Sequence, residues 1–150
     1  MAKRKSLKTD PCPVARALDV IGERWSLLIV RDAFDGMRRF GEFQKSLGVA
    51  KNILADRLHT LVEEGIFAVA PASDGTAYLQ YVLTAKGLAL FPVVVGLRQW
   101  SEAQLFEQGE PHSTLLQRGA GLPVRRIDVL AEDGRVLQAG DTVVLKVEAP

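Results

Sequence analysis

Two amphipathic segments separated by only three residues constrain the fold of this chain more than any other feature of its sequence. The first segment, Arg39 to Leu47, has apolar residues at positions 40, 43 and 47, and the second, Lys51 to Glu64, has leucines at 54, 58 and 61. Both spacings are those of a helix that buries one face. Because the link Gly48-Val49-Ala50 is so short, the sequence predicts a helix-turn-helix.

The residues after this motif change from helical to strand periodicity. A short apolar run, Ile66 to Val69, and a β-prone run, Tyr78 to Leu83, flank a turn-rich stretch with Asp74-Gly75 at its centre. Gly65 precedes them and suits the position just past a helix end. We therefore expect a β-hairpin, or wing, directly after the second helix of the motif.

Further helices are predicted on both sides of this core. Pro13 begins a helix that Gly22 ends, and a second helix covers Arg24 to Phe34. After the wing, Thr84 can cap one long helix that extends to about Phe106 and bends at Pro92.

The last part of the chain has the pattern of strands rather than helices. Val124 to Ala131, Arg135 to Gln138 and Thr142 to Val147 are separated by turn-forming residues. The sequence thus predicts an α+β fold with three parts: a basic N-terminal arm (1–11), a winged helix-turn-helix domain with flanking helices (12–107), and a β-rich extension (112–150) that forms a small β-meander.

The formal net charge of +1 conceals two local basic clusters. Residues 1–10 hold four basic residues against Asp10 alone, and residues 36–60 hold five basic residues against two acidic ones. A local cluster matters for phosphate binding because charges act over about 10 Å at physiological salt. The helix-turn-helix segment is thus suited to an anionic partner, although such a cluster is also typical of an ordinary solvated face.

Several function classes find no support in the sequence. There is no nucleophile–base pair, no glycine-rich phosphate loop and no HExxH motif, so we expect no enzyme activity. The single cysteine excludes an intrachain disulfide and a cysteine-built zinc site, and His59 carries no metal-binding signature, so we expect neither a metal nor a cofactor. No apolar stretch is long enough to span a bilayer and no signal peptide is evident, which predicts a cytoplasmic protein without a membrane partner.

An ordered series of short motifs runs from Cys12 to Gly87. It comprises Cys12-Pro13-Val14, Gly22, Arg24-Trp25, Leu27-Leu28-Ile29, Arg31-Asp32, Arg39-Phe40-Gly41-Glu42-Phe43, Leu54-Ala55-Asp56-Arg57-Leu58, Glu64-Gly65 and Tyr81-Val82-Leu83-Thr84-Ala85-Lys86-Gly87. In this order and spacing, over about residues 12–100, the series resembles the HxlR family of bacterial winged-helix regulators. Two positions depart from the family pattern: Ala50 stands where a Ser or Thr usually caps the second helix, and Tyr78 stands near the place of a wing arginine.

The resemblance implies a transcription regulator, a repressor or an activator, that binds double-stranded DNA as a homodimer. It implies that the N-terminal helix and the long helix after the wing form the dimer interface, so that the operator would be near-palindromic. Some members respond to oxidants or electrophiles through an N-terminal cysteine, which makes Cys12 a candidate redox sensor and an oxidant or a small molecule a candidate effector.

Placing the leucine stripe of the second helix inward predicts which residues face DNA. Asn52 could make a bidentate contact with adenine, and Ala55 could contact a thymine methyl group. Lys51 could reach a phosphate or a guanine edge, and the arginines before the first helix of the motif suit phosphate contacts that fix register. The full set of predicted DNA-binding residues is Arg38, Arg39, Lys51, Asn52, Ala55, Asp56 and His59.

Three alternatives remain open at this stage. Cys12 is either a sensor, since Lys8, Arg16 and the adjacent helix N-terminus favour its thiolate, or a small buried residue of the dimer helix. Arg57 is either a DNA contact or part of an ion pair with Glu42 or Glu63. Because the wing tip has no basic residue and Asp74 would repel phosphate, the chain is alternatively a winged-helix protein-interaction module that has lost DNA binding.

Overall fold

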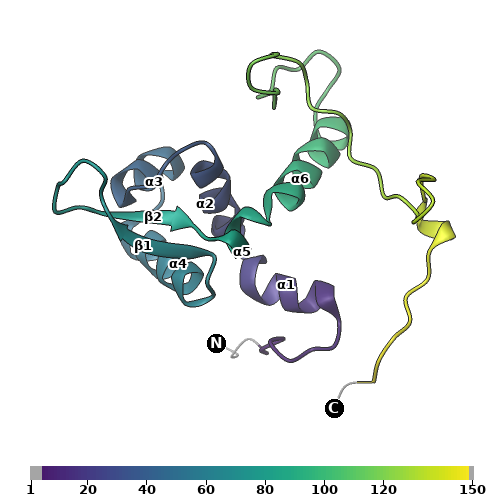
Figure 1. Cartoon of the computed structure of the whole chain (residues 1–150), viewed down its shortest axis with the longest axis horizontal. Coiled ribbons are helices and arrows are strands. Elements are labelled where there is room, and N and C mark those ends of the chain that lie inside the picture. The colour runs from purple at the N-terminus through teal and green to yellow at the C-terminus, as the bar shows by residue number, and fades with distance from the viewer. Residues whose placement is uncertain (1–4, 149–150) are drawn as a thin grey trace. The chain divides into compact units, whose positions relative to one another are not determined.

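The computed structural model describes residues 5–148, so the predicted arm residues Lys3 and Arg4 lie outside the described part. The chain divides into two units: one runs up to Phe91 and includes residues 146–148, and the other covers residues 92–145. The elements labelled in Figure 1 are α1 (Pro13–Ile21), α2 (Arg24–Phe34), α3 (Phe40–Leu47), α4 (Lys51–Glu63), β1 (Phe67–Pro71), β2 (Leu79–Leu83), α5 (Ala85–Leu88) and α6 (Phe91–Gln104). A short 3-10 turn, η1 (Ala139–Asp141), follows them.

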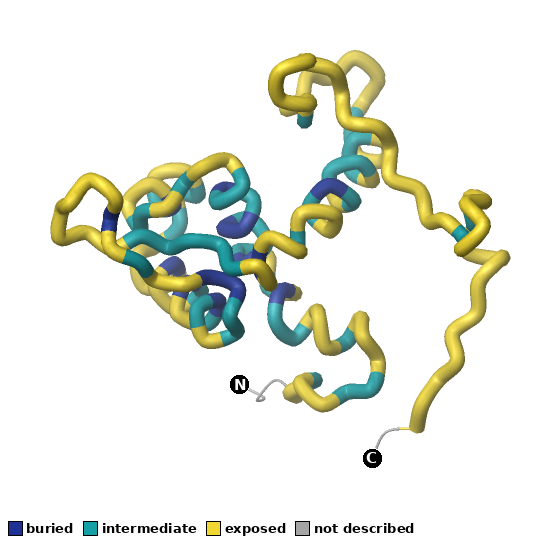
Figure 2. Tube along the Cα trace, viewed as in Figure 1, coloured by how far each residue is buried: buried dark blue, intermediate teal, exposed yellow. Residues whose placement is uncertain are grey.

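The core of the first unit lies where α2, α3, α4 and β1 meet. Each of these elements contributes side chains that are at most 3% exposed, and Figure 2 shows the buried positions gathered in this part of the chain. The rings of Phe43 on α3 and Phe67 on β1 pack edge to face, with their centroids 6.3 Å apart. The predicted helix-turn-helix is therefore confirmed, with apolar faces that close on one another. The core residues are Ile29, Val30, Phe43, Leu54, Leu58, Leu61, Ile66 and Phe67.

The hairpin that follows α4 is the predicted wing. β1 and β2 pair antiparallel, from Phe67 opposite Leu83 to Pro71 opposite Leu79. The main-chain N–H of Tyr81 also donates to the carbonyl oxygen of Arg38 at 2.7 Å, which ties the wing to the residues just before α3. A main-chain hydrogen bond thus joins the wing to the start of the helix-turn-helix.

Local signals define both ends of α4. Ala50 stands at its N-cap and makes no side-chain cap hydrogen bond, as the sequence indicates. At the other end Gly65 has a φ of 75°, and its N–H donates to Val62 while that of Ile66 donates to Leu61. This is the Schellman arrangement, for which a glycine in the left-handed region is best suited.

The prediction of one long helix from Thr84 to Phe106 is wrong. The Thr84 hydroxyl accepts a hydrogen bond from the Gly87 N–H at 3.1 Å and caps α5, but this helix ends at Leu88, and α6 begins at Phe91. Proline has no N–H to donate and its ring collides with the carbonyl four residues earlier, so a helix tolerates it only in the first turn. Pro92 occupies that position of α6, which explains the break before it.

The N-terminal residues 5–11 do not form a free arm in the described part of the chain. The N–H of Leu7 donates to the Asp19 carboxylate at 3.0 Å, so this stretch is held against α1. The other face of α1 is apolar and open to solvent, with Val14 66% exposed and Leu18 50% exposed. Only Ile21 of this helix is buried.

The predicted C-terminal β-meander is also wrong in its detail. Among the described residues after α6 there are two isolated bridges, Leu116 with Pro123 and Leu130 with Val136, and only the second joins two of the segments expected as strands. A hairpin of so few pairs is marginal without a third strand or a packed face. The segment from Thr142 onward pairs with no other described strand, and Figure 2 shows the region after α6 as almost entirely exposed.

Within residues 5–148, the structure contains no helix that is both long enough and apolar enough to cross a membrane.

Matched glycine-to-alanine changes test the packing of this unit. A Cβ at Gly87 would lie 2.3 Å from the carbonyl oxygen of Ile66 and 2.9 Å from a methyl group of Leu83, whereas a Cβ at Gly41 on α3 would meet nothing within 4 Å. We expect Gly87→Ala to lower the free energy of unfolding by about 1–3 kcal/mol or more through overpacking.

Gly41→Ala serves as the control, and should leave that free energy unchanged or raise it by up to about 1 kcal/mol, because alanine is the better helix former. Urea denaturation of both variants measures the difference. Equal midpoints for the two variants would contradict the close approach of α5 to the end of α4.

Candidate nucleic-acid interface

The exposed side of α4 carries every residue that the sequence predicts for this helix. Leu54, Leu58 and Leu61 are each 0% exposed and fix the rotation of the helix about its axis. At 100° per residue, Asn52, Asp56 and His59 then lie opposite this stripe. All five predicted residues are exposed, and they are Lys51, Asn52, Ala55, Asp56 and His59.

Acidic partners surround part of this face. His59 Nε2 lies 3.0 Å from the Glu63 carboxylate, one turn along the helix. Arg57 is 3.2 Å from Asp56 and 3.6 Å from Glu23, which precedes α2. The predicted pairing of Arg57 with Glu42 or Glu63 is therefore wrong, because Arg57 instead joins α4 to the start of α2.

The two arginines before α3 have different surroundings. Both of their main-chain N–H groups donate to the Glu42 carboxylate, at 3.2 Å for Arg38 and 3.0 Å for Arg39, so Glu42 caps the helix. The Arg38 side chain is exposed to solvent. The Arg39 guanidinium forms an ion pair with Asp74 at the wing tip and lies 5.5 Å from the ring centroid of Tyr78. Of the two arginines, Arg38 is therefore the one whose side chain is free to contact a phosphate.

Hydrogen bonds to Asp74 favour its ionised form at the wing tip. The main-chain N–H of Thr76 donates to the Asp74 carboxylate at 3.0 Å. Hydrogen bonds from Thr76, followed by the one from Arg39, lower the pKa of Asp74 from 3.8 to about 2. Asp74 is therefore ionised at neutral pH and remains a partner for Arg39.

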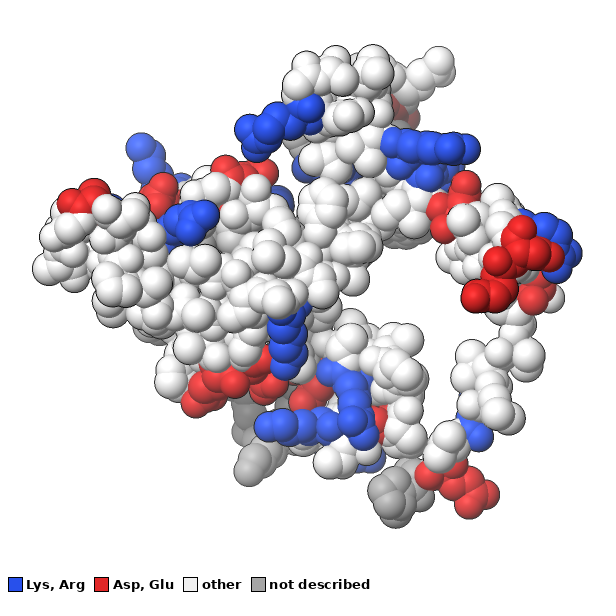
Figure 3. All heavy atoms as spheres, in the orientation of Figure 1, with Lys and Arg blue, Asp and Glu red and all other residues white. Residues whose placement is uncertain are grey.

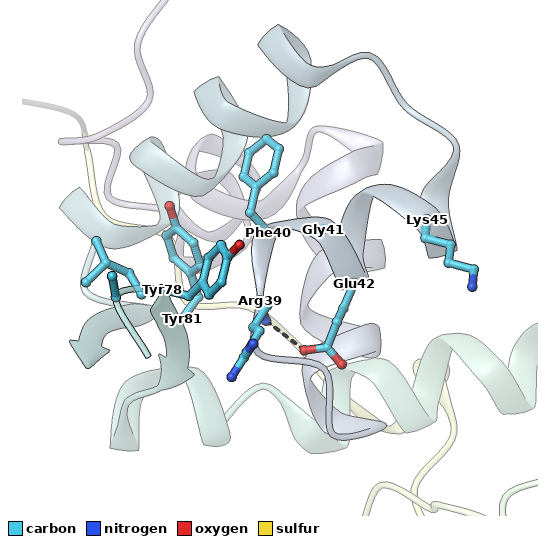
Figure 4. Close-up of a pocket in the computed structure, with 9 residues that line it drawn as sticks. Arg39, Phe40, Gly41, Glu42, Lys45, Tyr78 and Tyr81 are labelled. Carbon is cyan, nitrogen blue, oxygen red and sulfur yellow. Dashed lines mark hydrogen bonds between the residues drawn. The ribbon is translucent and has the colours of Figure 1, made fainter. Parts of the chain in front are cut away.

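An open groove of about 710 Å³ lies between the start of α3 and the wing. In Figure 4 the rings of Tyr78 and Tyr81 stand on one side of it, and Lys45 extends from the far end of α3. The groove thus combines aromatic walls with basic groups at its edge. It is lined by Arg39, Phe40, Gly41, Glu42, Lys45, Ala77, Tyr78, Leu79 and Tyr81.

The prediction from sequence omitted two exposed residues of the helix-turn-helix. Lys45 on α3 belongs to the basic cluster of the sequence and is exposed. Ile53, in the first turn of α4, is 40% exposed although it is a large apolar residue. A helical wheel drawn from the leucine stripe would have placed Ile53 at the margin of the exposed face.

Charges of both signs are mixed on the face that Figure 3 shows. In Figure 3 the Lys and Arg side chains are interspersed with Asp and Glu on the visible face and do not gather into one broad patch. On that face, affinity for a polyanion would therefore come from a few positioned cations and not from a continuous basic surface.

Cys12 lies at the N-cap of α1 and is exposed. Its N–H donates to the Asp10 carboxylate at 2.8 Å. Arg16, one turn into the helix, donates through Nε to the main-chain oxygen of Asp10 at 2.6 Å. In the single chain Cys12 is therefore a surface residue.

Comparison with known proteins identifies the family. The HxlR-like helix-turn-helix family matches residues 20–109. The HTH-type transcriptional regulator Rv3095 of Mycobacterium tuberculosis is 46% identical over 92 residues, a match that covers 61% of this chain and 58% of that relative. The chain thus spans less than two thirds of the length of this relative.

Solved structures agree with this assignment. PA1607, described as a candidate transcription factor, is 55% identical, with a TM-score of 0.89 over 94% of this chain and 99% of its own. The redox regulator HypR in its reduced form is 29% identical, with a TM-score of 0.58 over 63% of this chain and 94% of its own. From residues 20 to 109 the chain belongs to the HxlR-like family of helix-turn-helix proteins, which are transcriptional regulators and not enzymes.

Proposed function

We propose that the protein is a homodimeric regulator that binds a specific, near-palindromic operator with α4 in the major groove. The observation that carries this proposal is the division of α4 into a fully buried leucine stripe and an opposite exposed face that begins with Lys51 and Asn52. A recognition helix needs this division, since one face must be anchored while the N-terminal half of the other reaches the bases. Such a regulator acts in the cytoplasm, where bacterial DNA lies.

The side chains of this face have distinct roles in the proposal. Asn52 pairs with an adenine edge, and Ala55 meets a thymine methyl group. Lys51 and Arg38 contact phosphates and set the position of the helix on the duplex, which carries no sequence information by itself. Arg39 contributes less, because Asp74 already neutralises its charge.

The homodimer accounts for the exposed apolar face of α1. Val14 and Leu18 form an apolar stripe that water meets in the monomer, and such a face on a regulatory protein marks an interface. In the second unit, Leu97 and Trp100 of α6 are 50% and 60% exposed. A two-fold dimer built on these helices would present its two copies of α4 to successive major grooves, about 34 Å apart.

A change in Cys12 is the proposed signal. The residue is exposed at the start of α1, the helix that the dimer would use, so oxidation or alkylation there would alter the interface. HypR, which resembles this chain, is named a redox regulator. An oxidant or a reactive small molecule is therefore the proposed effector.

A gel-shift titration with the DNA upstream of the gene tests the DNA-binding proposal. We expect a specific shift that weakens steeply between about 50 and 200 mM salt, because each phosphate contact releases counterions. Lys51→Ala should weaken binding to all sequences and reduce the salt slope by about 1. Asn52→Ala should instead reduce discrimination at one A·T pair, by about 1–3 kcal/mol.

Arg135→Ala provides the charge-matched control. Arg135 is exposed in the second unit and pairs with Asp133, so its loss should leave the shift unchanged. If the protein fails to shift this DNA even at low salt, the proposal fails. Winged-helix contact with another protein, with DNA binding lost, then becomes the better explanation.

A Cys12→Ser variant tests the sensing proposal. We expect diamide or a quinone to change DNA binding by the native protein and to leave the variant unaffected, because serine lacks the nucleophilic thiolate. The gel shift measures the DNA binding of the native protein and of the variant. Non-reducing electrophoresis shows whether two Cys12 thiols become linked. An unchanged response in the variant would remove Cys12 from the mechanism.

A further inference from the structure

The groove between the start of α3 and the wing has the size and the composition of a small-molecule site. Its volume of about 710 Å³ falls within the roughly 300–1,000 Å³ of typical ligand pockets. Apolar and aromatic residues form most of its lining, and a few charged groups join them, as is usual for such pockets. Every lining residue lies between positions 39 and 81, so the first unit alone forms the groove.

Aromatic rings give the groove its apolar walls. Phe40 lies in the first turn of α3, and Tyr78 and Tyr81 belong to the wing. Tyr78 is 68% exposed, and in Figure 4 neither tyrosine hydroxyl is joined to another residue that is drawn. Aromatic rings favour offset-stacked or edge-to-face contact with other rings, and a phenol adds a polar group at its tip. These walls therefore suit a planar aromatic ligand.

Gly41 keeps the α3 side of the groove open. Glycine is a poor helix former, because the unfolded chain has more freedom to lose at this residue. Neither the backbone nor crowding requires it here, since its φ is not in the left-handed region and a Cβ would meet no atom within 4 Å. The local consequence of the missing side chain is free space along the groove.

The charged groups of the groove favour an anion. Arg39 and Lys45 belong to its lining, together with one acidic residue, Glu42. The Glu42 carboxylate already accepts hydrogen bonds from the main-chain N–H groups of Arg38 and Arg39. Within residues 5–148, Lys45 forms no ion pair. The groove therefore has a cation available to a ligand, while its carboxylate is already engaged.

The Arg39 guanidinium also has room for a second anion. A guanidinium carries several N–H donors in a planar fork that matches a carboxylate. Among the described residues, this group donates only to Asp74, through Nη2, and its other nitrogens make no hydrogen bond. The side chain is 33% exposed and lies 5.5 Å from the ring centroid of Tyr78. An anionic group on the open edge of Arg39 would thus lie beside the aromatic wall.

We propose that the groove binds a small planar aromatic compound with one anionic group, whose ring lies against Tyr78 and Tyr81 while its anionic group pairs with Arg39. The DNA backbone is a poorer occupant, because polar sugars and phosphates would not satisfy the apolar walls. The site requires neither DNA nor Cys12. The inference therefore goes beyond the regulator proposed above and gives it a second, reversible means of sensing a small molecule.

Amide chemical shifts of the full-length protein test the site, with naphthoate as the probe. We expect saturable changes centred on Gly41, Tyr78 and Tyr81, with a dissociation constant of about 1 mM or lower for a ligand of this size. Two matched compounds separate the contributions to binding. Adamantane carboxylate keeps the charge and the size but is not planar, and naphthalenemethanol keeps the rings without the charge. Each should bind at least about threefold more weakly than naphthoate.

Three results of this titration would overturn the proposal. The first is the absence of saturable changes, or changes that lie mainly outside the groove. The second is equal affinity for adamantane carboxylate, which would show that charge alone attracts the probe. The third is that DNA changes the shifts at the groove while naphthoate does not, which would assign the groove to the DNA interface.

Two substitutions of increasing size at Gly41 test whether binding takes place in the groove. Gly41→Leu fills the groove and should weaken naphthoate binding by at least about tenfold. Gly41→Ala adds one methyl group and should change the affinity by less than about threefold. Because the space around this position is open, both variants should keep the native circular dichroism. Undiminished binding by Gly41→Leu would contradict the proposed location.

Arg39→Gln tests the anionic contact independently of Gly41. We expect it to weaken naphthoate binding by at least about fivefold, because a charge-assisted contact is lost, and naphthalenemethanol binding by less than about twofold. Arg135→Gln is the matched control, since it removes an exposed arginine of the second unit and should leave both affinities unchanged. Equal losses for the two probes in Arg39→Gln would refute the pairing with Arg39.

These titrations are independent of the tests of DNA binding and of Cys12. They are made without DNA, and Cys12→Ser should bind naphthoate as the native protein does. Failure of naphthoate to bind would overturn the groove site and leave the proposal for α4 intact. Failure of the gel shift would overturn the proposal for α4 and leave the groove site intact.

Discussion

The packing of the α4 leucine stripe is the interaction on which the rest of the structure depends. Leu54, Leu58 and Leu61 are completely buried against the other elements of the core, so α4 cannot rotate without exposing them. Truncating one such leucine typically costs about 2–5 kcal/mol, a large part of the stability of a small domain. The same contacts therefore hold the fold together and determine which side chains of α4 face outward. One stripe of residues thus sets both the fold and the face of α4 that we propose for DNA recognition.

The wing lies beside the start of the helix-turn-helix but does not carry a basic tip. Its tip carries Asp74 instead of a basic residue, and this carboxylate pairs with Arg39 while Tyr78 lies beside the same guanidinium. The hydrogen bond from Tyr81 to Arg38 adds a main-chain link between β2 and the start of α3. The wing thus serves here to brace the helix-turn-helix. The charge of Asp74 is paired with that of Arg39, so in our proposal the contacts of the helix-turn-helix with a nucleic acid come from α4, Arg38 and Lys45.

Sequence patterns predict the parts of this fold that local interactions determine. The spacing of apolar residues located α1 to α4 to within a residue or two, and Gly65 marked the end of α4 because the left-handed turn there favours glycine. The exposed face of α4 followed from the leucine stripe alone. The sequence pattern did not predict the ion pairs of Arg39 with Asp74 and of Arg57 with Glu23. Each pair joins residues about 35 positions apart, and their proximity depends on the tertiary packing. The prediction of strands after α6 was wrong for a related reason. The residues there favour strands, but a strand forms only where a partner strand is present. The described part of the chain offers no such partner after Thr142.

The central claim, that α4 is the element in contact with DNA, is tested most directly by mapping the amide chemical shifts of the protein as its operator DNA is added. The account predicts that the largest changes fall on residues 51–59 and around Arg38, with small changes in the tail beyond Gln104. Changes concentrated in the tail, with the amides of α4 unaffected, would contradict it.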